Sequence, residues 1–146
     1  MIKKIVPEML DELTDLFVDT FNAPPWNDRW SLEQARTRLR DIMRMPHFCG
    51  AAEYREDRLV GLIMGHGEQS YDGMHFQILE LCVANDMKGH GIGSEMIREF
   101  TDYLDRKGVT SIYLLTMRGA ASEDFYAGQG FATVRDMCVM SRRHSQ

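Results

Sequence analysis

The sequence predicts a mixed α/β fold with a mostly antiparallel sheet of about 6–7 strands flanked by about 4 helices. Short apolar segments of strand character alternate with longer segments of helical periodicity. A glycine-rich run at 86–94 separates an apolar strand from an amphipathic helix, and a short apolar strand follows that helix. We therefore expect the order β-α-α-β-β-β-α-β-α-β-β, with residues 1–141 as one domain and 142–146 as a polar tail.

The first half of the chain predicts a strand, two helices and a hairpin. Pro7 suits the first turn of a helix, and Ser31 with Gln34 forms a capping box that begins the next one. The polar turn 55–58 joins two strand-like segments. The expected elements are strand 2–6, a helix from 7 to the stop at 23–25, a helix from 31 to the proline at 46, and strands 48–54 and 59–67.

The second half predicts a β-loop-helix-β unit followed by a shorter helix and a final strand pair. Residues 76–83 are apolar on both faces apart from Gln77 and Glu80, which is typical of a central strand. Gly108 ends the helix that follows the glycine run. The expected elements are strand 74–83, helix 91–107, parallel strand 111–116, helix 122–127 and a strand pair within 131–141.

Composition narrows the class of protein. At 146 residues the chain fits one globular domain, and its formal charge of −5 tells against nucleic acid as a partner and is compatible with a cationic substrate. No signal peptide or membrane-spanning apolar run is present, so we expect a cytoplasmic protein. The single cysteines 49, 82 and 138 have no spacing typical of zinc ligands, and no metal is expected.

The glycines at 89, 91 and 93 are placed to form a phosphate-binding loop. The N–H groups at the start of a helix lack intrahelical partners, and glycine lets the backbone approach an anion closely. A tight turn without a ligand is the alternative. The spacing matches neither the dinucleotide fingerprint G-x-G-x-x-G nor the P-loop, because no lysine followed by Ser or Thr ends the run and no acid ends strand 111–116.

Two motifs in order resemble the GNAT superfamily of acyl-CoA-dependent N-acyltransferases. The run Lys88-Gly89-His90-Gly91-Ile92-Gly93 resembles the family's acetyl-CoA signature [QR]-x-x-G-x-[GA], and Asp124-Phe125-Tyr126-Ala127-Gly128-Gln129-Gly130-Phe131 resembles its F-Y-x-x-x-G-F element. The segment 21–31 is also similar to a small bacterial subgroup. The resemblance spans nearly the whole chain and implies a GNAT-like single-domain N-acetyltransferase.

The resemblance also implies the residues that bind acetyl-CoA. The diphosphate would lie on backbone N–H groups of the glycine run, and the pantetheine arm would lie like an extra strand beside the preceding strand. The implied binding residues are Leu81, Cys82, Val83, Lys88, Gly89, His90, Gly91, Ile92, Gly93, Ser94 and Tyr126. Lys88 replaces the usual Arg or Gln, and Gly119 stands where many members carry an Asn.

Tyr126 and Glu80 are the candidate catalytic residues. The position of Tyr126 in the second motif implies a general acid for the departing thiolate, and the alternative is a buried tyrosine that packs on Phe125 and Phe131. Glu80 is the only acidic side chain between Phe76 and Val83, so burial would raise its pKa toward that of a general base. The alternative is a structural glutamate that pairs with an arginine.

The acceptor is not specified by the sequence. Trp26 and Trp30 are candidates for the wall of an acceptor pocket, or else core or dimer-contact residues, so a homodimer is compatible with the sequence. His66, His75 and His90 lack ligand spacing, and hydrogen-bonded or surface roles are expected for them. The predicted activity is acetyl transfer to a primary amine of a small molecule or peptide, and the alternative is a non-catalytic acyl-CoA-binding domain.

Overall fold

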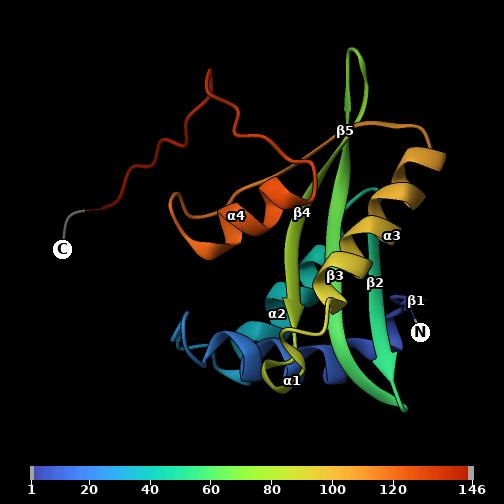
Figure 1. The fold of residues 1–146 in the computed structure, drawn as a ribbon, viewed down its shortest axis with the longest axis vertical. Coiled ribbons are helices and arrows are strands. Elements are labelled where there is room, and N and C mark those ends of the chain that lie inside the picture. The colour runs from blue at the N-terminus through green and yellow to red at the C-terminus, as the bar shows by residue number, and fades with distance from the viewer. Residues whose placement is uncertain (1, 145–146) are drawn as a thin grey trace. The chain divides into compact units, whose positions relative to one another are not determined.

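The computed structural model describes residues 2–144 and divides the chain into two units, Met1–Leu115 and Thr116–Gln146. The first unit holds a five-stranded sheet in the order β1-β2-β3-β4-β5 (Figure 1). All neighbouring strands are antiparallel except β4 and β5, which are parallel. Its strands are β1 (Ile2–Lys4), β2 (Phe48–Arg55), β3 (Arg58–Ser70), β4 (Gly73–Val83) and β5 (Val109–Leu114).

Helices cover both faces of this sheet (Figure 1). A short 3-10 turn precedes α1, and another overlaps the start of the glycine-rich run. The Ser31–Gln34 capping box begins α2 as predicted. The helical elements of the first unit are η1 (Pro7–Met9), α1 (Leu10–Phe21), α2 (Leu32–Met43), η2 (Asn85–Met87) and α3 (Ile92–Arg106).

The alternation of β3 side chains divides the core into two layers. Leu62 and Met64 are buried on the α1/α2 face, where Phe17 of α1 and Leu39 of α2 are also buried. Phe76 of β4 packs on Phe100 of α3 across the other face, with ring centroids 5.6 Å apart. Each fully buried side chain of this size contributes about 1.5–3 kcal/mol, so the two layers hold the sheet between its helices.

The described part of the second unit, residues 116–144, contains one helix, α4 (Ala121–Gly128), where a short helix is expected. The strand pair expected within 131–141 is wrong, because residues 131–144 form no strand in the described chain. The apolar side chains that suggested it, Val134, Met137, Val139 and Met140, are exposed. Neither burial nor a hydrogen-bonded neighbour in this unit holds the segment as a strand, so the sheet has five strands rather than 6–7. The expected tail includes residues 145–146, which lie outside the described residues.

Candidate functional site

The edge of β4 toward β5 opens just before the glycine run. The β4–β5 pairing ends at Ile78 and Leu114, although β4 continues to Val83. Residues 79–83 therefore have no strand neighbour on that side among the strands described. A strand edge of this kind presents N–H and C=O groups to an extended partner. Leu81, Cys82 and Val83 lie in this segment, where a pantetheine arm is expected.

A bulge at Leu79 accompanies this opening. Met64 of β3 pairs with Glu80 and Gly65 pairs with Ile78, which leaves Leu79 as the extra residue on β4. A side chain on Gly65 would place its Cβ 1.9 Å from the carbonyl oxygen of Gln77. Gly65 therefore lets the two backbones approach closely where the ladder shifts.

The glycine run forms a tight loop into α3. Gly89 and Gly91 have φ of +83° and +76°, and Gly91 is the left-handed N-cap of α3. A Cβ at either glycine would meet no atom within 4 Å, so the space in front of these residues is open. Positive φ explains why glycine is required, and the first-turn N–H groups of α3 favour an anion. The residues therefore fit a diphosphate.

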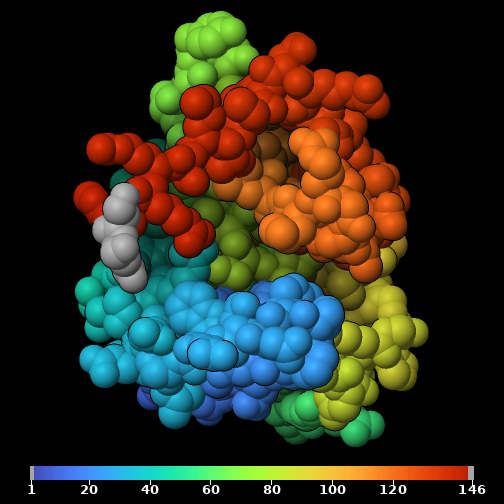
Figure 2. Space-filling model, turned by 90° about the vertical axis from the view of Figure 1, so that its left-hand side faces the viewer, coloured from blue at the N-terminus to red at the C-terminus, as the bar shows by residue number. Residues whose placement is uncertain are grey.

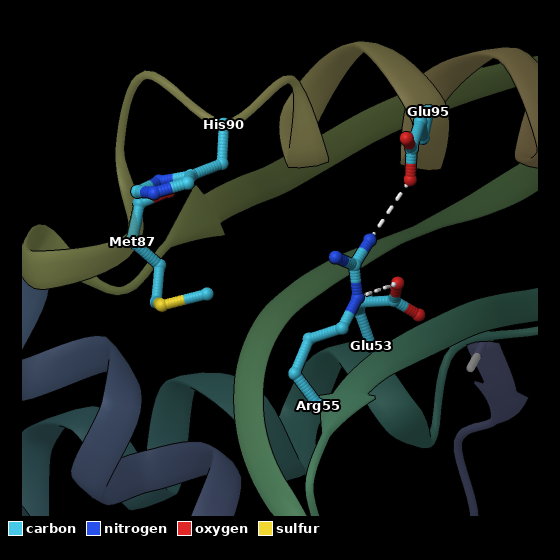
Figure 3. A network of polar contacts seen from close by, with 5 residues as sticks. All are labelled: Glu53, Arg55, Met87, His90 and Glu95. Carbon is cyan, nitrogen blue, oxygen red and sulfur yellow. Dashed lines mark hydrogen bonds and ion pairs between the residues drawn. The ribbon is translucent and has the colours of Figure 1, made fainter.

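Polar contacts hold this loop in place. Arg58 donates two hydrogen bonds, of 2.7 and 2.8 Å, to the carboxylate of Asp86, and these lower the pKa of Asp86. The Asn85 side chain donates to the carbonyl oxygen of Asp19 on α1. His90 is exposed, and its ring turns back along the loop so that Nδ1 lies 3.0 Å from the carbonyl oxygen of Met87 (Figure 3).

Arg55 at the end of β2 fixes the first turn of α3. Its guanidinium bonds to Glu53 and to Glu95, each at 2.9 Å (Figure 3). Glu53 is buried and lies two positions before Arg55 on β2, so the arginine connects the sheet to the helix that follows the loop. A loop fixed at both ends is preorganised for a ligand, because little ordering entropy is lost on binding.

Trp26 lies beside the glycine run. The ammonium of Lys88 lies over the Trp26 ring, 4.2 Å from its centroid, and the ring packs edge-on against Phe21. Figure 2 shows the loop after α1, in light blue, next to the yellow-green chain around the glycine run. Partial burial lowers the pKa of Lys88. Trp26 thus contacts the residue predicted to bind phosphate, a pairing that the sequence pattern did not reveal.

Trp30 is held at the base of the same loop. The Asn22 side chain accepts a hydrogen bond from the N–H of Trp30 and donates one to its carbonyl oxygen, both at 2.9 Å. The indole packs on Phe17, and its Nε1 donates to Asp28. Trp30 is thus largely a structural residue of this loop, and it positions Asp28.

Glu80 pairs with an arginine of α2. Nε of Arg38 donates a 2.7 Å hydrogen bond to Oε1 of Glu80, whose side chain is 11% exposed. Burial raises the pKa of Glu80, while Arg38 opposes that rise and the charge of Asp28 adds to it. The structure therefore contains the predicted arginine pairing and, at the same time, the raised pKa expected of a base. Arg38 itself was not identified from the sequence, because the pair joins residues 42 positions apart.

Cys82 is a buried residue behind the open edge of β4. Burial raises the pKa of its thiol to about 12, and the Thr20 hydroxyl of α1 opposes the rise. A protonated, enclosed thiol is not nucleophilic, so Cys82 serves here as a small buried hydrophobe. The N–H of Ala84 donates to the carbonyl oxygen of Val60 on β3, so by alternation the backbone groups of Cys82 also point toward β3 and those of Leu81 and Val83 face the opening.

Tyr126 belongs to the second unit, on α4. Its ring makes edge contacts with Phe125 and Phe131, at centroid distances of 5.1 and 5.7 Å. These are the contacts expected of a tyrosine that only packs on Phe125 and Phe131. A role as general acid depends instead on the hydroxyl group. Gly119, which precedes this helix, has a φ of +77° and donates its N–H to Glu123.

The sequence profile of the Acetyltransferase (GNAT) family matches residues 9–131. The chain belongs to this family. The search of curated proteins found no match to this chain. The GNAT match spans the α1–α2 region, the glycine run and the Phe-Tyr element that were singled out from the sequence.

Solved structures share the GNAT fold of this chain at low sequence identity. A probable acetyltransferase superposes with a TM-score of 0.82 at 16% identity, covering 100% of this chain and 99% of the other. An aminoglycoside N-acetyltransferase in complex with CoA gives 0.78 at 12% identity, covering 99% and 95%. A soil-metagenome aminoglycoside acetyltransferase in complex with sisomicin gives 0.73 at 16%, covering 100% and 96%.

Residues 2–144 contain no group of three or more His, Cys, Asp or Glu side chains arranged to hold a metal. None of the helices described combines the length and apolar character that a bilayer crossing requires.

Proposed function

We propose that this protein transfers the acetyl group of acetyl-CoA to a primary amine by direct attack of the amine in a ternary complex. The observation that carries the proposal is the open edge of β4 after Ile78, followed directly by a loop with Gly89 and Gly91 at positive φ. The first feature suits an extended amide-bearing arm and the second suits a diphosphate. Membership of the GNAT family supports the same reaction.

Acetyl-CoA supplies an acetyl group activated as a thioester. Backbone N–H groups of Lys88 to Ser94 hold the diphosphate in this proposal, and an N–H near Cys82 or Val83 donates to the thioester oxygen. Glu80 takes a proton from the acceptor ammonium, directly or through water, which its raised pKa favours. A carbon–nitrogen bond forms and the carbon–sulfur bond breaks. Tyr126 protonates the departing sulfur, and the second proton, released by the amine nitrogen as the amide forms, returns to Tyr126 directly or through water.

The test is release of free thiol from acetyl-CoA across a panel of primary amines, peptides and sisomicin. We expect amine-dependent release that Glu80→Gln reduces by about 100-fold. Glu99→Gln, on the exposed side of α3, serves as the charge-matched control and should leave turnover unchanged. Acetyl-CoA binding without thiol release from any amine would contradict the proposal.

The second candidate is a non-catalytic acyl-CoA-binding domain, and the Arg38–Glu80 pair favours it. A carboxylate held at 2.7 Å by a guanidinium has one oxygen engaged before any acceptor arrives. Thermal stabilisation by acetyl-CoA, with no thiol release from any amine of the panel, would establish this alternative.

A further inference from the structure

A row of polar side chains extends from Glu80 along one face of the sheet. On β3 every second side chain points to the same face of the sheet, so residues 64, 66 and 68 all lie on the α1/α2 face. Their partners across the β3–β4 ladder are Glu80 for Met64, Gln77 for His66 and His75 for Glu68. Tyr113 of β5 lies next to Gln77. We define the polar row as His66, Glu68, Gln77 and Tyr113.

Polar contacts connect the four side chains of the row. The hydroxyl of Tyr113 donates a 2.8 Å hydrogen bond to Glu68 and lies 3.4 Å from the side-chain oxygen of Gln77. The imidazole of His66 lies 3.7 Å from the same Glu68 carboxylate. Burial and Glu68 together raise the pKa of Tyr113 to about 12, so its proton stays on the hydroxyl at neutral pH.

Glu68 is the anionic member of this row, and its side chain is 51% exposed. Among the described residues, the basic group within ion-pair distance of it is the imidazole of His66, and no Lys or Arg pairs with it. Glu80, by contrast, is paired with Arg38. Glu68 therefore presents a carboxylate that is oriented by Tyr113 and can still accept a cation.

We infer that the polar row binds a second ammonium group of the acceptor, and that the acceptor is an oligocationic amine. This inference rests on the proposed function. Glu68 lies four positions beyond Met64, the residue opposite Glu80, which places the backbone positions of the two carboxylate residues about 13 Å apart along the strand. The chain's net charge of −5 favours the same class of acceptor. Linear polyamines and amino sugars share this chemistry.

The test compares diaminooctane with aminooctanol, which replaces one ammonium by a neutral hydroxyl at the same length. Calorimetric titration of the CoA-saturated protein should show at least about tenfold tighter binding of the diamine. Glu68→Gln should remove that preference, whereas Glu99→Gln should retain it. Tyr113→Phe should reduce it in part, because the ring remains while the hydroxyl that orients Glu68 is lost. Spermine and sisomicin, titrated in parallel, distinguish a linear polyamine from an amino sugar.

Equal affinity for the two probes, weak binding of both, or a preference that survives Glu68→Gln would overturn the inference. Thiol release, measured on the same samples, tests the proposed function separately. Preferred diamine binding without thiol release would refute acetyl transfer and leave the polar row as a cation site. Thiol release at equal rates from both probes would support acetyl transfer and refute the polar row as a cation site.

Discussion

Nε of Arg38 on α2 donates a 2.7 Å hydrogen bond to Oε1 of Glu80 on β4. Arg38 lowers the pKa of Glu80, and burial raises it by more. Arg38→Ala should therefore raise that pKa further, because the lowering contribution is lost. A base acts when deprotonated, so the acid limb of kcat/KM should move to higher pH. A pH profile of thiol release measures the shift.

Arg36→Ala is the matched control for this profile. Arg36 pairs with Asp11 at an exposed position on the same helix, and its loss should leave the acid limb in place. An acid limb that stays unchanged in Arg38→Ala would show that another group acts as the base.

Tyr126→Phe should lower kcat by about 100-fold or more while the protein remains folded, because the ring contacts with Phe125 and Phe131 are kept. Single-turnover thiol release measures the loss. Tyr103→Phe, on α3, removes a hydroxyl from a tyrosine outside the candidate site and serves as the control. Full activity of Tyr126→Phe would show that Tyr126 is not the general acid and that its ring serves only in packing.

Gly91→Ala should cost about 1–2 kcal/mol of stability, because an L-residue is placed at a φ of +76°. The added Cβ meets open space, so the cost comes from the backbone rather than from a clash. The affinity for CoA, measured by titration, should fall as well. Gly128→Ala, at the end of α4 where φ is not positive, should be neutral or stabilising.

Trp26→Leu should weaken acetyl-CoA binding more than acceptor binding, since Trp26 contacts Lys88. A double-mutant cycle with Lys88→Met should give a coupling energy of about 0.5–1 kcal/mol for CoA binding. A change confined to the KM of the amine would instead support the acceptor-wall interpretation.

Gly65→Ala should destabilise the fold by about 3 kcal/mol or more, because its Cβ would lie 1.9 Å from a backbone oxygen that cannot move aside. Gly61→Ala on the same strand is the comparison. Its Cβ would meet the Met96 sulfur at 2.5 Å, and that flexible side chain can shift, so the cost should be smaller. Chemical denaturation measures both, and equal losses would contradict this account of the bulge.

Local signals predicted much of the fold. The Ser31–Gln34 capping box, the helix after the glycine run and the strand 74–83 all depend on neighbouring residues, and the structure contains each of them. The expected strand pair within 131–141 failed because apolar alternation indicates a strand only where a partner edge and a buried face exist. Residues 131–144 have neither in their unit.

The candidate site was predicted only in part, for a related reason. The glycine spacing identified the loop, because backbone conformation there depends on residue type. Arg38 and Tyr113 come together with Glu80 and Glu68 through register and helix packing over more than 35 positions. Nothing in the local sequence of either partner specifies such a pairing. Even the bulge at Leu79 becomes visible only when β3 and β4 are aligned.

The amide of Asn22 joins the two ends of the segment 23–29 through the backbone of Trp30. Because the closure uses backbone groups of Trp30, it does not depend on the residues inside the segment. We therefore expect this loop to tolerate changes in length and sequence while α1 and α2 keep their positions. Substitutions in this segment that keep Trp26, which contacts Lys88, can therefore change the surface it presents at low cost to the fold.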